Sequence, residues 1–522
     1  MHTRLQSASG PNAFTLRIPV PSALNIPEWR SRLLNYSDLE LCDFLEFGWP
    51  VGYAAADLPV SSHHNHGSAL SSLQTINSFL DTEYHLGATC GPFITNPLCV
   101  ALVTSPLQIA HSRSGKPRVV VDLSFPPGSS VNSGIPSDTY LGKPFVLRLP
   151  GVDALVDIVR SKGAGCHLFK KDLSRAYRQL RIDPRDAHLL GFRHNNLLYI
   201  DLAPPFGLRS SAMMCQRTTN AVSYLYKTLG FSCTNYIDDF GGAETPDMFT
   251  QAFNALGDLF TSLGLQSSPD KDCPPTTSMV FPGVQLDTLA MSMSVTPERL
   301  QELHQRCSSL LSSTRISRHD LQSLLGVMSF VTACVRPARV FMSTLLNTLR
   351  LSQASRFCFL SEDNRSDLRW WCHFLPLYNG MSLIKSAPWL DDPWHLSTDA
   401  CNTGAGGYFT GQYFHTPFPD SILQRFGDDI NILELLTIMA ALKLWGPALH
   451  SQRFIIRCDN NNCVLALNSG RSRTLGMQLC LREIYFSTYC KQKSVGRFLL
   501  SDLSTFAVGM VHSSGHAKKR QQ

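Results

Sequence analysis

The chain has 522 residues, of which 43% are hydrophobic, and this length suggests about three domains rather than a disordered chain or one small domain. The net charge of +6 neither requires nor excludes a nucleic-acid partner. Sixteen cysteines are scattered without a C-x-x-C pair, which argues against a disulfide framework or a structural zinc site. Because it has neither a signal pattern nor a membrane-spanning apolar run, we predict an intracellular protein, cytoplasmic or nuclear, that is neither secreted nor membrane-bound.

Residues 1–84 form the first predicted segment. They combine a short helical pattern around Trp29 with stretches rich in proline, serine and histidine, so we expect a partly ordered amino-terminal extension. In residues 85–290, strand-like runs such as Val119–Val121 and Leu198–Ile200 alternate with helical stretches and turns. This alternation predicts an α+β domain.

Residues 291–389 change to a helical pattern. Thr296 can cap a helix that begins at the following proline, and Ser317 with Asp320 three residues later predicts a second helix start. The apolar face of that second helix is predicted to be core and consists of Leu321, Leu324, Leu325 and Met328. A stretch rich in proline and tryptophan then leads into residues 390–522, where the pattern indicates strand, strand, helix, strand and helix.

Two acidic positions in the α+β segment follow apolar, strand-like runs. Asp172 comes three residues after Phe169, and Asp238 and Asp239 lie together within Tyr236–Phe240. Phosphoryl transfer from a nucleotide uses two divalent cations, and carboxylate oxygens suit magnesium, with manganese as the alternative ion. We expect Asp238 to be the stronger ligand and Asp239 the supporting one. An ordinary turn stabilised by aspartate side chains is the competing interpretation of the pair.

The order of these motifs resembles that of retroelement reverse transcriptases. The matching segments are Lys170–Tyr177 (KKDLSRAY), Pro205–Ala212 (PFGLRSSA) continuing to Gln216, Tyr236–Phe240 (YIDDF), Lys271 and Phe281–Gly283 (FPG). The resemblance covers most of the chain and implies a multidomain α+β fold with a right-hand polymerase. It assigns the fingers and palm to residues 85–290, a helical thumb and connection to residues 291–389, and a ribonuclease H-like α/β domain to residues 390–522.

The resemblance also implies nucleotide-binding roles for five residues. Tyr177 falls where the family places a bulky ring against a ribose 2′-hydroxyl, and Arg118 falls in a fingers hairpin that grips the triphosphate. Gly207 would let the backbone approach the nucleotide closely, Gln216 would face the template, and Lys271 would stabilise the leaving pyrophosphate. Taken singly, Tyr177 is also explained as a buried core tyrosine and Arg118 as a surface arginine.

Four further segments narrow the resemblance to DIRS-type retrotransposons, which integrate with a tyrosine recombinase. These segments are Asp122–Asn132, Gly207–Ser211, Ser366–Trp371 and Asn431–Leu435. The implied partners are an RNA template, a DNA primer, an RNA–DNA hybrid and deoxynucleoside triphosphates. A recombinase or other proteins of the element are further candidates, since the chain has no evident recombinase or protease motif.

A second set of acidic residues lies in the last segment. Asp399 and Asp459 each end a predicted strand, and Glu434 lies in the first turn of a helix predicted over Asn431–Trp445. This order resembles ribonuclease H, whose carboxylates hold two magnesium ions beside an RNA phosphate. Taken singly, Glu434 is better explained as a favourable charge at a helix start or as the capping-box partner of Asn431, and Asp459 as a helix cap; together, the three positions favour the catalytic interpretation. The family's last motif begins at Val511–Gly515 but its fourth carboxylate has no counterpart, so we expect a domain truncated at its carboxyl terminus.

The sequence therefore predicts an RNA-directed and DNA-directed DNA polymerase that works by two-metal nucleotidyl transfer, with weak or absent ribonuclease H activity. Two alternatives stay open. One is a catalytically inactive nucleic-acid-binding remnant that keeps the fold, and the other is a hybrid-cleaving nuclease without polymerase activity. Primer extension and hybrid cleavage by the purified chain distinguish the three.

Overall fold

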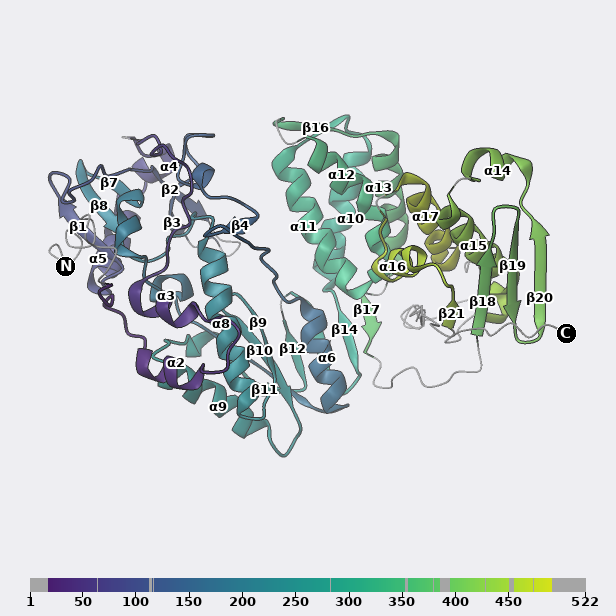
Figure 1. The fold of residues 1–522 in the computed structure, drawn as a ribbon, viewed down its shortest axis with the longest axis horizontal. Coiled ribbons are helices and arrows are strands. Elements are labelled where there is room, and N and C mark those ends of the chain that lie inside the picture. Colours follow the sequence, from purple (N-terminus) through teal and green to yellow (C-terminus); the bar gives the residue numbers. More distant parts are fainter. Residues whose placement is uncertain are drawn as a thin grey trace. The chain divides into compact units, whose positions relative to one another are not determined.

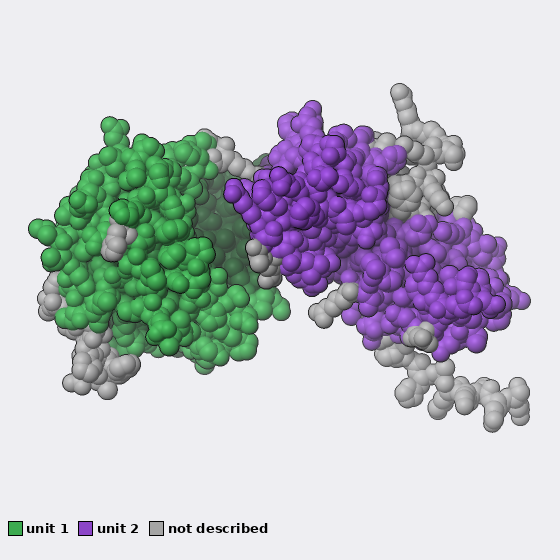
Figure 2. Space-filling view, turned by 90° about the horizontal axis from the view of Figure 1, so that it is seen from above, with its two compact units in different colours: residues 1–158, 166–276 green, residues 159–165, 277–522 purple. Residues whose placement is uncertain are grey.

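A computed structural model gives the fold, which is 45% helical and 20% strand. It describes residues 17–490 except 63, 112–114, 116, 282, 353–354, 379, 385–394, 428, 450–454 and 473. The chain divides into two compact units, coloured green and purple in Figure 2. Unit 1 comprises residues 1–158 and 166–276, and unit 2 comprises residues 159–165 and 277–522. The predicted boundary at residue 390 lies outside the described residues, and the other predicted domain boundaries stay predictions.

The central sheet of unit 1 is antiparallel, with strand order β11-β6-β10-β9. Its strands are β6 (His167–Asp172), β9 (Cys233–Tyr236), β10 (Asp239–Glu244) and β11 (Cys273–Thr276). A two-residue turn of Ile237 and Asp238 joins β9 to β10, and Ile237 has a left-handed backbone (φ 57°), as tight hairpin turns require. Gly242 of β10 admits the Phe169 ring of β6, because a Cβ at Gly242 would lie 2.3 Å from that ring.

Two helices pack on this sheet, α8 (Ser211–Thr228) and α9 (Phe249–Ser262), and Figure 1 shows both beside β9, β10 and β11. Their buried apolar residues recur at helical spacing and include Ala221, Val222, Leu225, Leu256, Leu259 and Phe260. The Tyr226 hydroxyl of α8 donates a 2.7 Å hydrogen bond to the Ala252 carbonyl of α9. The two helices are therefore fixed to each other as well as to the sheet.

The amino-terminal segment is packed into the core of unit 1. Its helices are α2 (Ile26–Arg32), α3 (Leu41–Phe47), α4 (Gly67–Leu70) and α5 (Leu73–His85). Trp29 is fully buried, and its indole Nε1 donates a 2.9 Å hydrogen bond to the Leu263 carbonyl. Trp49 is also fully buried, and its backbone N donates to the Arg181 carbonyl. Residues 17–85 thus contribute core side chains to the unit that carries Asp172.

Smaller elements complete unit 1, and they confirm the strands predicted at Val119–Val121 and Leu198–Ile200. A three-stranded sheet contains β1 (Thr89–Phe93), β8 (Leu197–Asp201) and β7 (Gly191–His194). Two hairpins are β2 (Leu107–His111) with β3 (Pro117–Val121), and β4 (Thr139–Tyr140) with β5 (Lys143–Pro144). The remaining elements are α6 (Val152–Lys162), which ends in residues of unit 2, α7 (Ala176–Gln179), η1 (Asn132–Gly134), η2 (Pro184–Leu189) and η3 (Pro269–Lys271).

Unit 2 begins with a four-stranded antiparallel sheet and a group of helices. The strands, in sheet order, are β12 (Ser278–Val280), β13 (Gln285–Asp287), β14 (Ser292–Ser294) and β17 (Met381–Leu383), and β15 (Arg315–Ser317) pairs with β16 (Phe357–Phe359). The helices are α10 (Pro297–Leu311), α11 (Arg318–Cys334), η4 (Arg336–Met342), α12 (Ser343–Leu351), α13 (Glu362–Phe374) and η5 (Leu375–Leu377).

Both predicted helix starts in this region are confirmed in position, but their caps differ. The Ser317 hydroxyl accepts a 3.0 Å hydrogen bond from the Asp320 backbone N, as the pattern predicted. Thr296 precedes α10, but its side chain makes no capping hydrogen bond, so the predicted side-chain cap is wrong. The four predicted core residues of α11 are all buried.

The last part of unit 2 is a sheet of order β20-β19-β18-β21 with four helices. Its elements are β18 (His395–Ala400), β19 (Gly404–Phe409), β20 (Gln412–Pro417), α14 (Asp420–Phe426), α15 (Ile430–Leu449), β21 (Ile455–Arg457), α16 (Asn461–Ser469) and α17 (Leu475–Cys490). The predicted pattern of three strands and two helices missed β20, where all but one residue is exposed, and two of the four helices, including the short α14. Within the described residues, none of the helices combines the length and apolar character needed to cross a membrane.

Candidate active sites

The three carboxylates predicted from the first motifs come together at one end of the central sheet of unit 1. Asp172 is the last residue of β6, and its cross-strand partner is Asp239, the first residue of β10. The Asp172 and Asp239 side chains lie within hydrogen-bonding reach of each other. Asp238 lies in the adjoining turn, and its backbone carbonyl accepts a 3.1 Å hydrogen bond from Leu173 N. Residues 66 positions apart in sequence thus form one acidic cluster.

Electrostatics of this cluster favour binding of a cation. Burial raises the pKa of Asp238 to about 6, and the negative charges of Asp172 and Asp239 add to the effect. Burial also raises the pKa of Asp172, against the opposing effect of Lys271. Crowded, partly desolvated carboxylates of this kind are stabilised by a divalent cation, and oxygen donors suit magnesium.

Two lysines occupy part of the space around the carboxylates. Lys271 Nζ donates a 2.8 Å hydrogen bond to Asp172 Oδ1, and Lys170 Nζ lies 2.8 Å from Asp239 Oδ1. The Lys271 side chain is 56% exposed, whereas that of Asp172 is 6% exposed. The Lys271 ammonium therefore occupies a hydrogen-bonding position on Asp172 from a largely exposed side chain. Its predicted contact with pyrophosphate stays a prediction.

Gln216 supports the turn that carries Asp238. Its Oε1 accepts a 2.8 Å hydrogen bond from Ile237 N, and its Nε2 donates to the Asn235 carbonyl and to Asn220 Oδ1. The side chain is buried, with 2% exposed, and both amide atoms are engaged by the protein. The residue predicted to face the template thus stabilises the Ile237–Asp238 turn, and template contact stays a prediction.

A row of aromatic and basic side chains leads away from the acidic cluster. Tyr177 of α7 lies near Asp238, whose charge, after burial and Cys215, contributes to raising the Tyr177 pKa. The ring centroids of Tyr177 and Phe206 are 5.4 Å apart, and the Arg118 guanidinium of β3 lies 5.8 Å from the Phe206 ring centroid. Arg118 is exposed and has no carboxylate within ion-pair distance among the described residues. A nucleotide along this row would place its sugar beside Tyr177 and its triphosphate beside Arg118, as the sequence predicted. Phe206 was not predicted, although it directly precedes Gly207 in the motif.

Gly207 has a structural reason for being glycine. Its backbone is left-handed (φ 107°), and a Cβ there would lie 2.2 Å from the Val121 carbonyl of β3. The Asn132 side chain donates a 2.7 Å hydrogen bond to the Gly207 carbonyl. The close approach that needs glycine is therefore to the β2–β3 hairpin, and the predicted approach to a nucleotide stays a prediction.

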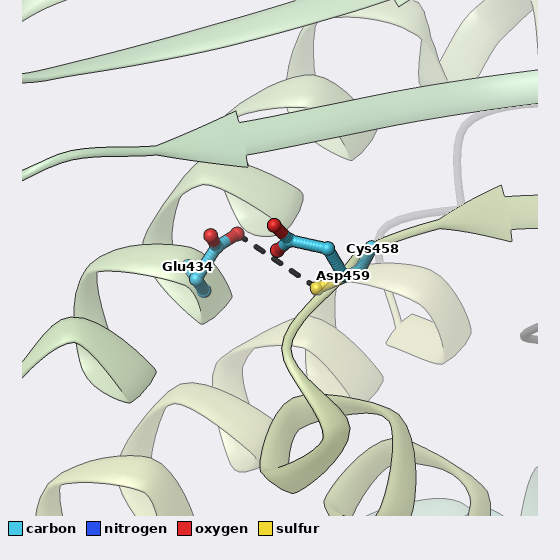
Figure 3. Close-up of side chains that lie close together, drawn as sticks. All are labelled: Glu434, Cys458 and Asp459. Carbon is cyan, nitrogen blue, oxygen red and sulfur yellow. Dashed lines mark hydrogen bonds between the residues drawn. The ribbon is translucent and has the colours of Figure 1, made fainter. Parts of the chain in front are cut away.

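The second set of acidic residues lies at the ends of two parallel strands in unit 2. β18 and β21 pair in parallel, with Ser397 opposite Arg457, so Asp399 and Asp459 each follow two residues beyond that pair. Glu434 enters from α15 and is buried, and its Oε1 accepts a 3.2 Å hydrogen bond from Ala400 N. Figure 3 shows Glu434 and Asp459 pointing toward each other beside Cys458.

Three ligand atoms in this site, from Glu434, Cys458 and Asp459, lie within 4.8 Å of one another. Burial raises the pKa of Glu434 to about 8, with further contributions from Cys458, Asp459 and Asp399. Two of the three predicted carboxylates, Glu434 and Asp459, thus group with the Cys458 thiol and could hold a divalent cation, whereas Asp399 is not part of this group.

Cys458 was missed as a member of this site. Its Sγ lies 3.8 Å from Glu434 Oε2, and a hydrogen bond with the Cys463 thiol holds the pKa of Cys458 below its ordinary value. The only sequence signal was its place directly before Asp459 at a strand end. A thiol at this position adds a soft donor to an otherwise hard oxygen site.

The structure corrects two details of the predicted site. Glu434 lies in the second turn of α15, because the helix begins at Ile430, and Asp429 rather than Glu434 bonds the Asn431 backbone N. The cap of α16 is Asn460, which accepts from two backbone N–H groups, so the alternative role of Asp459 as that cap is wrong. Val511–Gly515, where the last motif begins, lies outside the described residues.

Comparison with known proteins supports the fold assignment. The chain matches no family model and no curated protein. It is similar to the structure of a foamy viral protease-reverse transcriptase in complex with double-stranded DNA, with 14% identity, a TM-score of 0.50, and 98% of this chain and 85% of that chain covered. A second complex of that protein with double-stranded DNA has 13% identity, a TM-score of 0.47, and 93% and 98% covered. A complex with an RNA/DNA hybrid has 14% identity, a TM-score of 0.46, and 98% and 67% covered. The predicted multidomain α+β fold, similar to that of a reverse transcriptase, is confirmed.

Proposed function

We propose that this chain is an RNA-directed and DNA-directed DNA polymerase. The observation that carries the proposal is the pairing of Asp172 with Asp239 across β6 and β10, beside the turn that holds Asp238. This arrangement gathers three carboxylates at the end of a sheet, next to Tyr177. Similarity of the fold to a viral reverse transcriptase supports the same assignment.

The charged residues of the site have different proposed roles. Asp172 and Asp238 would hold magnesium, or manganese, and a pair of such ions supplies positive charge to the attacking 3′-oxygen and to the triphosphate. Asp239 supports the site, since Lys170 already pairs with it. Lys271 pairs with Asp172, and its ammonium could also stabilise the leaving pyrophosphate.

We assign nucleotide selection to the row formed by Tyr177, Phe206 and Arg118. The half-buried Tyr177 ring packs against Phe206 and cannot swing freely, so it would collide with a ribose 2′-hydroxyl. Arg118 lies at the far end of the row, where no described carboxylate is within ion-pair distance, and its planar fork of donors suits phosphate oxygens. Deoxynucleoside triphosphates are the substrates that these two residues favour.

Primer extension tests the proposal. The purified chain is given a primed RNA template, deoxynucleoside triphosphates and magnesium, beside an Asp238→Asn variant. We expect extension by the unaltered chain, none after chelation of magnesium, and a loss of about a hundredfold or more in the variant, because metal-held charge is worth several kcal/mol. Equal signal from the two proteins would sink the polymerase assignment.

A second activity is proposed for the site of Asp399, Glu434 and Asp459, which we infer to act on the RNA strand of an RNA–DNA hybrid. The support is that Glu434 and Asp459 lie close together, and that Asp399, on the strand parallel to the one before Asp459, contributes to raising the pKa of Glu434. Only two of the predicted carboxylates belong to the group of ligand atoms, whose third member is the Cys458 thiol, so we expect weak cleavage.

We also propose that the chain derives from a DIRS-type retroelement and acts inside the cell. The segments around Asp122–Asn132 and Ser366–Trp371 support this origin. An RNA template and a DNA primer are then its natural partners, and a recombinase or other proteins of the element are further ones.

A further inference from the structure

Unit 1 contains a cavity that the proposed chemistry does not use. Its volume is about 690 Å³, which lies in the range of small-molecule sites. The amino-terminal segment 17–24 forms one wall, and residues between Ser174 and Arg185 form another. Both walls belong to unit 1.

Most of the cavity lining is apolar. The contributing side chains include Ile18, Val20, Leu24, Phe47, Leu86 and Leu202. Burial of an apolar ligand body against these side chains would contribute about 25 cal/mol for each Å² of apolar surface removed from water.

Five arginines also line the cavity, and four of them are neutralised by carboxylates. Arg178 pairs with Glu83 and Asp201, Arg175 with Glu83, Arg185 with Asp183, and Arg17 with Asp43 and Asp183. Arg181 differs, because no carboxylate lies within ion-pair distance of it among the described residues. Burial and the neighbouring Arg178 lower the Arg181 pKa to about 10, against the opposing effect of Glu83, which lies beyond ion-pair distance.

The hydrogen bonds of Arg181 leave one donor unused. Its Nε donates to the Pro21 carbonyl, Nη1 to the Arg178 and Leu180 carbonyls, and Nη2 to the Leu86 carbonyl. A guanidinium has five N–H groups, and these contacts use four. The cavity therefore offers one positive charge and one N–H group beside an apolar wall.

We propose that this cavity binds a monocarboxylate with an apolar body, with the carboxylate on Arg181 and the body against the apolar wall. A single uncompensated charge matches a monoanion, whereas a phosphate would need more donors than Arg181 has left. This binding is independent of nucleotide incorporation. Failure of either proposal would therefore leave the other unaffected.

Isothermal titration calorimetry of the full chain tests the proposal with decanoate as the probe. Acetate, which lacks the apolar body, and decanol, which lacks the charge, serve as comparison ligands. We expect saturable binding of decanoate at one site, and at least tenfold weaker binding of both comparison ligands. Absence of saturable decanoate binding would overturn the proposal, and so would decanol binding as tightly as decanoate.

Two variants and a control locate the site. Arg181→Gln should weaken decanoate binding at least tenfold, whereas Arg32→Gln, the same change at an exposed residue outside the cavity, should leave it unchanged. Ser22→Trp fills the cavity from its wall without touching the arginine, and should abolish binding while the circular dichroism spectrum stays unchanged. If Arg181→Gln does not fold, Ser22→Trp decides alone. Undiminished binding by Ser22→Trp, or equal binding by the two glutamine variants, contradicts the proposal.

Discussion

At the scale of single residues, the site of unit 1 places the Tyr177 ring close to the Asp238 carboxylate, which lies near Asp172 and Lys271. Tyr177 is fixed by Phe206 on one side and lies close to Asp238 on the other. Lys271 donates a hydrogen bond to Asp172. If the chain is a polymerase, each of these contacts should affect a different measurable property of nucleotide incorporation.

Tyr177→Ala should relax the choice of sugar. Removing the ring removes the collision with a ribose 2′-hydroxyl, so we expect ribonucleotide incorporation to rise by at least about tenfold relative to deoxynucleotide incorporation. The measurement is the ratio of kcat/KM values for the two nucleotides on one primed template. Tyr177→Phe, which keeps the ring, is the matched control and should retain selectivity; the idea fails if both variants discriminate like the unaltered chain.

Lys271→Met should change the pH dependence of incorporation. Lys271 lowers the pKa of Asp172, so its loss raises that pKa further, and Asp172 must be ionised to bind metal. The acid limb of the rate profile should therefore move to higher pH, with a larger loss of rate at pH 6 than at pH 8. An equal loss at both pH values would show that Lys271 does not act through Asp172.

At the scale of elements, one buried ion pair connects helices far apart in the sequence of unit 2. Arg482 of α17 pairs with Asp367 of α13, whose side chain is fully buried. The Asp367 carboxylate also accepts a hydrogen bond from the Thr344 hydroxyl of α12. The Asp367 carboxylate therefore links α12, α13 and α17.

Arg482→Met should destabilise unit 2 by about 3–5 kcal/mol, because it leaves the buried Asp367 charge without its partner. Urea denaturation followed by circular dichroism measures the change. Arg471→Met, the same substitution at an exposed arginine, is the control and should change stability by less than about 0.5 kcal/mol. A similar small effect of Arg482→Met would mean that the ion pair contributes little.

Local patterns predicted those elements whose signals lie within a few residues. Ser317 and Asp320 are three residues apart, and they marked the start of α11 correctly. Thr296 marked the start of α10 at Pro297 correctly, but its side chain makes no capping hydrogen bond. The pairing of Gln216 with Ile237 and that of Arg482 with Asp367 have no local signal, because each partner becomes a neighbour only after folding. Motif order could name Asp172 and Asp239, but it could not show that Lys271 lies on Asp172.

At the scale of the whole molecule, the chain carries two acidic sites, one in each unit. The site of unit 1 has all three predicted carboxylates together. The site of unit 2 has two carboxylates grouped with Cys458, and the nearby Asp399 raises the pKa of Glu434. The fold similarity covers nearly the whole chain, and each site makes its own prediction.

The unit 2 site should give weak cleavage of an RNA–DNA hybrid. Only Glu434 and Asp459 are grouped there, and the third ligand atom is a soft thiol sulfur, so the rate should be low. Cleavage of a labelled hybrid in magnesium is the assay, and Asp399→Asn should remove whatever activity is found. Robust turnover by the purified chain would refute the expectation of weak activity, and activity that survives Asp399→Asn would place it elsewhere.

The most direct test of the polymerase proposal is the single-turnover rate of one deoxynucleotide addition on a primed RNA template. Asp172→Asn removes one proposed metal ligand, and Asp270→Asn makes the same change at an exposed residue next to Lys271. We predict that Asp172→Asn lowers the rate by about a hundredfold or more, while Asp270→Asn leaves it within about twofold. Equal rates for the two variants, or no addition by the unaltered chain, would contradict the assignment of the Asp172, Asp238 and Asp239 cluster as a polymerase active site.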